Sequence, residues 1–204
     1  MLAGKTACRA DLSELERTSL APQLAKALKS LHAIPLSEIK PLHLPADQLQ
    51  RMDVIYRRKL IAEHMQALLE QNLIAKNQEL KINLLLAGLP EAFSAKRPLT
   101  LCHGDLYARH LIVNAEKNLV GLIDWGDVHR GDPAVDLAIV YGFLPAEAHA
   151  DFWRVYGLVS EDTLTLARFR ALYHSLSLLR YAQEIQDPEL LRDTLQALDR
   201  IFSE

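Results

Sequence analysis

The sequence lacks the features that mark secreted and membrane proteins. Only two cysteines occur, Cys8 and Cys102, so we expect two buried thiols in a reducing compartment rather than a disulfide framework. No apolar run approaches the roughly 20 residues that span a membrane. No apolar segment follows Met1, as a signal peptide would require. A cytoplasmic protein without a membrane partner is therefore expected.

The chain also lacks an excess of charge of one sign. Its 204 residues include 23 basic and 26 acidic side chains, for a net charge of -3. This balance argues against the basic footprint of a nucleic-acid-binding protein. Half of the residues are hydrophobic and the mean hydropathy is near zero. Such a composition is typical of one globular domain with a substantial core.

Helical patterns dominate both ends of the chain. A capping-box pattern that starts at Ser13 predicts a helix to about residue 32, which Pro22 should kink or restart. Three prolines predict a loop over residues 34–45. Asp132 and Pro133 predict another helix start, as N-cap and first helical residue. Further helices are predicted over residues 47–74, 78–86, 145–156, 161–184 and 188–202.

The centre of the chain is rich in predicted strands and carries two aspartates. Asp105 comes shortly after the apolar run LTLC, and Asp124 comes directly after LVGLI. Between them, the apolar run LIV and the polar turn NAEKN predict a hairpin that begins after His110. We therefore expect short strands to bring both aspartates to one edge. The whole is a mostly helical α+β fold with one small β element.

This layout suits phosphoryl transfer. That reaction needs one carboxylate to accept or orient the attacking hydroxyl, and a second to hold the cation that shields the phosphates. Two neighbouring aspartates can supply both carboxylates, and Asp124 can serve as the magnesium ligand because Mg²⁺ prefers hard oxygen ligands. Either aspartate alone could simply cap a turn after a strand. Their occurrence together in this ordered pattern favours a functional role for both.

Four motifs resemble, in order and spacing, the aminoglycoside phosphotransferase family. They are LHAIP at residues 31–35, HGD at 103–105, IDWG at 123–126 and GDPAVDLA at 131–138. A generic protein kinase carries HRD, an Asn five residues later and DFG in the same order. The resemblance implies a kinase-like fold and an enzyme that transfers the γ-phosphate of ATP or GTP. The acceptor would be a hydroxyl of a small molecule, such as an aminoglycoside or a choline-like compound, and Mg²⁺ would assist.

The resemblance also implies roles for individual residues. Asp105 would be the catalytic base and Asp124 a metal ligand, while His103 and Asp136 would support the catalytic loop. His110 departs from the family, which has Asn at this position, where the amide oxygen helps to hold a metal. An imidazole suits Mn²⁺ or Zn²⁺ better than Mg²⁺. His110 could therefore ligate a metal, hydrogen-bond Asp105, or mark a site that has lost metal binding.

The matching motifs cover only part of the family's pattern. The family's N-terminal lobe holds the nucleotide phosphates with a glycine-rich loop and a strand-borne lysine, and this sequence contains neither motif. We therefore expect residues 1–204 to form a single C-terminal catalytic and substrate lobe, without the N-terminal nucleotide lobe. A lobe without its partner exposes cleft surface, which favours self-association.

Other polar residues have two interpretations. Arg109 could neutralise phosphate or pair with a surface carboxylate, and Asp127, His129 and Arg130 could contact substrate or form a polar loop. The remaining histidines show no metal-ligand spacing and are expected to be structural or at the surface: His32, His43, His64, His149 and His174. One acidic group could bind a cationic substrate or form a solvated face: Glu147, Asp151, Glu161, Asp162, Glu184 and Asp187.

Three functions remain open from the sequence. The first is the small-molecule kinase. The second is a catalytically impaired kinase-like lobe that acts as a binding module, which the missing nucleotide lobe and His110 favour. The third is a metal-dependent hydrolase, whose residue types suit a metal centre although their spacing fits kinase-like enzymes better. It would use His103, Asp105, His110, Asp124 and Asp127.

Overall fold

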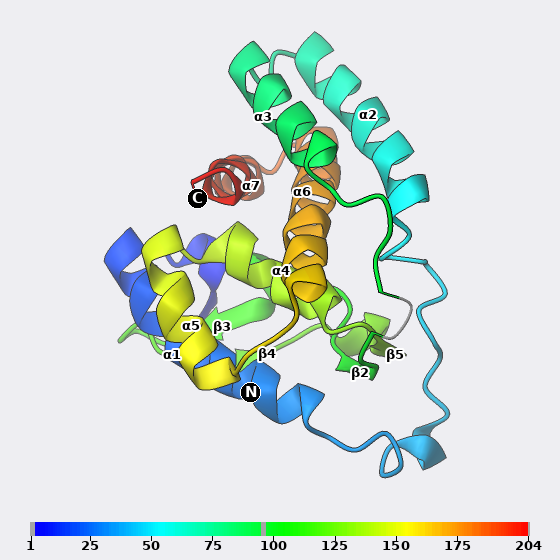
Figure 1. The fold of residues 1–204 in the computed structure, drawn as a ribbon. Helices are drawn as coiled ribbons and strands as arrows, with labels where there is room; N and C mark the ends of the chain where they lie inside the picture. Colours follow the sequence, from blue (N-terminus) through cyan, green and yellow to red (C-terminus); the bar gives the residue numbers. More distant parts are fainter. Residues whose placement is uncertain (1–2, 95–96, 204) are drawn as a thin grey trace.

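The protein is mostly helical, as the sequence predicted (Figure 1). The computed structural model describes residues 3–94 and 97–203. The α-helices are α1 (Glu14–His32), α2 (Val54–Glu70), α3 (Lys76–Ala87), α4 (Ala134–Phe143), α5 (His149–Tyr156), α6 (Glu161–Glu184) and α7 (Pro188–Ile201). None of the helices in this described part is long and apolar enough to cross a membrane.

The strands are short and form two small antiparallel sheets. They are β1 (Lys5–Thr6), β2 (Thr100–Cys102), β3 (Leu111–Val113), β4 (Leu119–Leu122) and β5 (His129–Gly131). One sheet has the order β1-β3-β4 and the other pairs β2 with β5. The predicted hairpin is the β3–β4 pair, in which Leu111 lies opposite Leu122. In the second sheet Cys102 lies opposite His129. The two sheets thus hold both ends of the loops that carry the aspartates.

Helix α1 begins where the capping box predicted. The backbone N–H of Ser13 donates to Glu16 at 2.8 Å, and the N–H of Glu16 donates to the Ser13 hydroxyl at 3.2 Å. Pro22 lies inside a continuous helix, so the predicted restart there is wrong. Leu20 and Leu24, which flank the proline, are almost fully buried. Packing of this face holds the helix together where the local preference of proline opposes it.

Helix α6 is the central element of the fold (Figure 1). It packs against α4 and α7, and against α2 and α3 at its far end. Its bounds agree with the predicted range 161–184, and the Ser160 hydroxyl caps its first turn by accepting from the N–H of Thr163 at 3.2 Å. Because α6 crosses the core, side chains from its inner face can reach loops that lie far away in the sequence.

Several predicted boundaries differ from the structure. Helix α2 is shorter than the predicted helix over residues 47–74. It begins later because Asp53 caps it by accepting from the N–H of Tyr56 at 2.9 Å. Helix α4 begins one residue later than expected, although the Asp132 carboxylate does accept from the N–H of Ala134 at 2.9 Å. Strands β1 and β5 were not predicted, because two or three residues carry too little periodicity to be recognised.

Candidate active site

The loop after β2 carries Asp105 and depends on Gly104. Gly104 has a φ of +91°, a conformation that L side chains rarely adopt. A Cβ atom at this position would overlap the carbonyl oxygen of Asp127 and lie 2.8 Å from Nδ1 of His129. The loop therefore packs directly against the segment that follows Asp124, and only glycine fits at the contact.

Asp136 fixes the backbone of the same loop. Its carboxylate is fully buried on α4 and accepts backbone N–H bonds from His103 at 2.7 Å and from Gly104 at 2.9 Å. Nε2 of His32 lies 3.1 Å from the same carboxylate. Burial acts to raise the pKa of Asp136, but the bonds from His32 and the two N–H groups outweigh it and lower that pKa. The carboxylate is therefore ionised.

Asp105 is held between two histidines. Its Oδ1 lies 3.2 Å from Nε2 of His174 on α6, and its Oδ2 lies 3.8 Å from Nδ1 of His110. Burial acts to raise the pKa of Asp105, but the hydrogen bond from His174 and the charges of His174, His110 and Arg170 lower it to about 2. Burial lowers the pKa of His174, despite its bond to Asp105. At neutral pH an ionised Asp105 therefore accepts from a neutral imidazole.

His110 joins the two aspartates in one site. Its Nδ1–H donates to the carbonyl oxygen of Asp105 at 2.6 Å, and its Nε2 lies 3.3 Å from Oδ2 of Asp124. His110 is buried, whereas two thirds of the Asp124 side chain is exposed. Because Nδ1 carries the proton in the neutral ring, Nε2 then presents a lone pair to the carboxylate. Either a second proton or a cation is needed to make that contact favourable.

His103 is fully buried and fixed by neutral contacts. Its Nε2–H donates to the carbonyl oxygen of Ile123 at 2.8 Å, and its Nδ1 accepts from the backbone N–H of Asp105 at 3.4 Å. Its ring packs on Trp125 at a centroid distance of 4.6 Å. The imidazole thus ties the loop of Asp105 to the backbone just before Asp124.

The sequence interpretation missed two histidines of this site. His174 was expected to be structural or at the surface, yet it contacts Asp105. His32 was placed in the same group, yet it bonds Asp136 and the hydroxyl of Tyr156, the latter at 2.7 Å. His32 lies in the LHAIP motif, which was a usable signal. Nothing near His174 in the sequence points to Asp105, because only the packing of α6 brings them together.

The other polar residues lie in ion pairs or hydrogen bonds away from Asp105. Arg109 lies 4.0 Å from Asp187, which favours the surface-pair interpretation. Asp127 lies 3.2 Å from Arg51. Part of the acidic group has structural partners: Asp151 pairs with Arg154, Asp162 accepts from the N–H of Ser94, and Asp187 caps α7.

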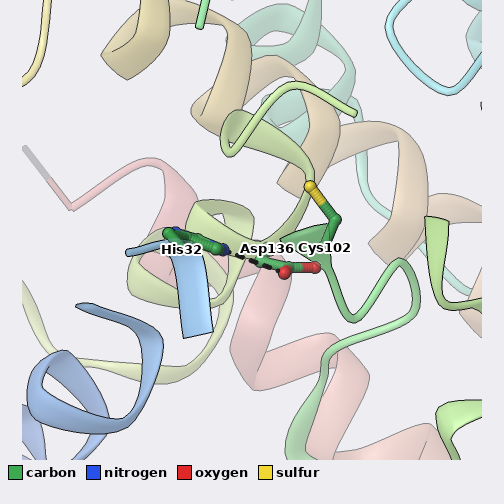
Figure 2. A group of neighbouring side chains, drawn as sticks. All are labelled: His32, Cys102 and Asp136. Atoms are coloured by element: carbon green, nitrogen blue, oxygen red, sulfur yellow. Dashed lines mark hydrogen bonds and ion pairs between the residues drawn. The ribbon is translucent and has the colours of Figure 1, made fainter. Parts of the chain in front are cut away.

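A buried cluster of His32, Cys102 and Asp136 has ligand atoms within 4.8 Å of one another (Figure 2). The dashed line in Figure 2 joins only His32 and Asp136. Both carboxylate oxygens of Asp136 already accept N–H bonds. Burial strongly raises the pKa of Cys102, so its thiol stays protonated, and metals bind the thiolate. This cluster therefore supports the loop and does not fit a metal ion.

The solved structures with a similar fold include phosphotransferases. Macrolide 2′-phosphotransferase type I matches with a TM-score of 0.54 and 20% identity, over 95% of this chain and 66% of that one. The GDP and kanamycin complex of APH(2″)-IIIa matches with a TM-score of 0.59 and 18% identity, over 98% and 68%. ADP-bound aminoglycoside phosphotransferase APH(2″)-Ib matches with a TM-score of 0.51 and 22% identity, over 99% and 71%.

The chain spans about two thirds of the length of these structures, and at such identities the likeness concerns the fold alone. No curated protein sequence matches the chain. The model of the phosphotransferase enzyme family (APH) matches residues 1–172, which is most of the sequence. This agrees with the resemblance of the four motifs. The chain therefore belongs to the phosphotransferase enzyme family.

Proposed function

We propose that this chain carries the catalytic residues of a nucleotide-dependent phosphotransferase that transfers a γ-phosphate to a hydroxyl of a small molecule. The observation that supports it most is the linkage of Asp105 and Asp124 through His110. Two carboxylates from different loops then face one reaction site, as phosphoryl transfer requires. The acceptor could be an aminoglycoside, a choline-like compound or another alcohol.

Asp105 is proposed to orient the acceptor hydroxyl and to receive its proton. A carboxylate whose pKa is about 2 is ionised throughout the neutral range, so it accepts a hydrogen bond from any hydroxyl presented to it. The same low pKa makes it a weak base. Its main contribution is therefore positioning, with the proton moving as the phosphoryl group arrives. His174 fixes Oδ1 and leaves the other oxygen for the hydroxyl.

Asp124 and His110 are proposed to hold the cation. Their facing atoms are 3.3 Å apart, a spacing suited to neighbouring ligands of one ion, and the exposed Asp124 leaves room for phosphate oxygens and water. A bound Mg²⁺ would neutralise negative charge on the phosphates. The imidazole nitrogen in place of an amide oxygen also suits Mn²⁺. The donor set of these two residues therefore fits a divalent cation, and its imidazole nitrogen suits Mn²⁺ better than Mg²⁺.

The nucleotide is proposed to be ATP or GTP, since the similar structures include an ADP-bound and a GDP-bound phosphotransferase. We propose that residues 1–204 correspond to a C-terminal catalytic lobe, because the sequence carries the aspartate loops and no glycine-rich phosphate loop. His103 and Asp136 are proposed to keep the catalytic loop in shape through their backbone contacts.

A transfer assay tests this proposal. The chain is incubated with ATP or GTP, with Mg²⁺ or Mn²⁺, and with a panel of hydroxylated small molecules. Asp105→Asn and Asp124→Asn should each lower turnover at least a hundredfold, whereas Asp151→Asn, on the exposed face of α5, should not. Undiminished turnover in either active-site variant would refute the assignment. His110→Asn should shift the metal preference from Mn²⁺ toward Mg²⁺.

A second candidate is a binding module without transfer. The contact of Nε2 of His110 with Asp124 favours it, because a doubly protonated His110 would fill the cation's place. Thermal unfolding with and without nucleotide and metal distinguishes the two candidates. A saturable rise in melting temperature that needs both nucleotide and metal favours the enzyme. Binding of small molecules without any metal-dependent rise favours the module.

A further inference from the structure

Tyr156, the last residue of α5, begins a chain of hydrogen bonds that runs into the protein. Its hydroxyl lies 2.7 Å from Nδ1 of His32, and Nε2 of His32 lies 3.1 Å from Oδ2 of Asp136. The dashed line in Figure 2 marks the second of these contacts. The three side chains come from α5, α1 and α4. Packing of α5 against α1 therefore joins a tyrosine hydroxyl to a buried carboxylate through one imidazole.

The chain of hydrogen bonds ends on the Asp105 loop (residues 103–107). Oδ2 of Asp136 accepts from the backbone N–H of His103 at 2.7 Å, and Oδ1 accepts from that of Gly104 at 2.9 Å. These two residues directly precede Asp105. The same carboxylate thus receives the two loop N–H groups and the His32 ring, so a change at the ring alters the hold on the loop.

With a neutral His32 ring, one arrangement of protons satisfies every group of the chain. The ionised carboxylate of Asp136 can only accept, so Nε2 of His32 carries the ring proton. Nδ1 then presents a lone pair, and the Tyr156 O–H donates to it. Burial and the charge of Asp136 raise the pKa of Tyr156, so its hydroxyl stays protonated at neutral pH. The hydroxyl of Tyr156 therefore favours the tautomer that donates to Asp136.

Neighbouring contacts fix the ring that carries this hydroxyl. The Tyr156 ring stacks on Phe152 with a centroid distance of 5.6 Å and an interplanar angle of 16°. It also meets the His32 ring edge-on at 5.8 Å. One residue earlier, Nζ of Lys29 on α1 donates to the carbonyl oxygen of Val155 at 2.9 Å. The end of α5 is thus attached to α1, and the hydroxyl is oriented before it donates to His32.

We infer that Tyr156 is a positioning residue for Asp105, because its hydroxyl fixes the His32 ring in the state that lets Asp136 hold the Asp105 loop. The inference rests on the proposed function for the role of Asp105. Without the hydroxyl, Nδ1 stays unpaired in a side chain that is only 5% exposed, which is unfavourable. The ring then shifts its proton to Nδ1 or gains a second proton. The first change removes the bond that Asp136 accepts, and the second places a positive charge beside that carboxylate.

Amide hydrogen exchange, measured by NMR on the 204-residue chain, tests the inference without turnover. Tyr156→Phe keeps the ring and removes the hydroxyl. It should speed exchange at the amides of His103 and Gly104 about fivefold, because a hydrogen bond contributes about 1 kcal/mol and each 1.4 kcal/mol is tenfold. The rates are compared with that of the Leu172 amide, at the buried centre of α6, which reports global unfolding. Tyr56→Phe, at a tyrosine that is 48% exposed on α2, is the matched control and should leave all three rates unchanged.

A second variant separates positioning through the imidazole from loss of packing. His32→Gln keeps a side-chain N–H that can donate to Asp136 but has no ring nitrogen that needs the tyrosine hydroxyl. In this background Tyr156→Phe should have no further effect on the two loop amides. A merely structural Tyr156 predicts the same increase in both backgrounds. The ¹⁵N chemical shifts of the His32 ring give an independent readout: the wild type should carry its proton on Nε2 alone, and Tyr156→Phe should change this state.

Two results would overturn the inference: unchanged relative exchange at the loop amides in Tyr156→Phe, or a wild-type His32 ring with its proton on Nδ1. Neither measurement needs turnover. If the loop amides respond as expected but no transfer is found, the proposed function fails and the hold of Tyr156 on the loop stands. Where transfer is found, Tyr156→Phe should lower kcat about fivefold and leave the KM of the nucleotide unchanged, because a displaced Asp105 orients the acceptor hydroxyl less well. An unchanged kcat together with faster exchange would refute the positioning of Asp105.

Discussion

Replacing Gly104 with alanine should lower the free energy of unfolding by about 3–4 kcal/mol. The left-handed φ of +91° costs an L-residue about 1–2 kcal/mol. The new Cβ also overlaps the carbonyl oxygen of Asp127, and overpacking of this kind costs about 1–3 kcal/mol. That carbonyl accepts from Nδ1–H of His129 at 2.8 Å, so it cannot move without breaking a buried hydrogen bond.

Two other glycines separate these causes. Gly157 has a φ of +111° and a ψ of 175°, a conformation that essentially only glycine adopts, but no atom lies within 4 Å of the position that a Cβ would take, so Gly157→Ala should lose about 1–3 kcal/mol. Gly142 lies in α4 with open space around it, and Gly142→Ala should be about 0.5–1 kcal/mol more stable than wild type. Each of the three variants adds one methyl group to the wild-type protein, so differences in their stability come from the position of the glycine.

Urea unfolding followed by circular dichroism at neutral pH measures all three. The expected order of stability places Gly142→Ala first, then wild type, Gly157→Ala and Gly104→Ala. If Gly104→Ala were as stable as Gly157→Ala, the close approach of the Asp105 loop to the Asp127 segment would be refuted. In the transfer assay Gly104→Ala should also lose about a hundredfold in rate, because a shifted loop misplaces Asp105.

Three further predictions follow from buried and charged groups. Asp105→Asn should flatten the dependence of stability on pH. The folded pKa of Asp105, about 2, lies below the ordinary 3.8, so the ionised carboxylate stabilises the fold above about pH 4, and the wild type loses about 1–2 kcal/mol of this stabilisation as the pH falls to about 2. Equal pH slopes of variant and wild type in urea unfolding would contradict this. Asp193→Ala should cost about 3 kcal/mol in thermal unfolding, because it leaves the buried guanidinium of Arg17 without the carboxylate now 3.0 Å away; Arg17→Met in the same chain should restore most of the loss. Native protein at about pH 8 should not be alkylated by iodoacetamide at Cys8 or Cys102, because burial raises the pKa of both thiols, and mass spectrometry showing labelling within minutes would argue against it.

Much of the fold could be predicted because its signals are local. The Ser13 capping box and the range of α6 agree with the structure, since capping residues and helical periodicity act within a few residues. The hairpin after His110 was also correct, because two apolar runs flank a polar turn. These same local signals failed for β1 and β5, whose pairing partners lie far away in the sequence.

The candidate site divides in the same way. The prediction that Asp105 and Asp124 lie together is confirmed, because the hairpin between them is short and His110 begins it. The catalytic and metal-binding roles of these residues stay predictions. The structure narrows the possible roles of His110. Its Nδ1–H donates to the carbonyl oxygen of Asp105, so only Nε2 is available for a second proton or a cation.

By itself the sequence determined the family and the loops that carry Asp105 and Asp124. Motif spacing does this, because backbone geometry over a few residues decides which side chains a loop can present. Tertiary structure alone decided that His174 meets Asp105 and that Arg57 and Arg170 share the ring of Tyr173. Those contacts arise only when α6 packs against α2 and the Asp105 loop, since no local pattern encodes the distance between segments so far apart in the chain.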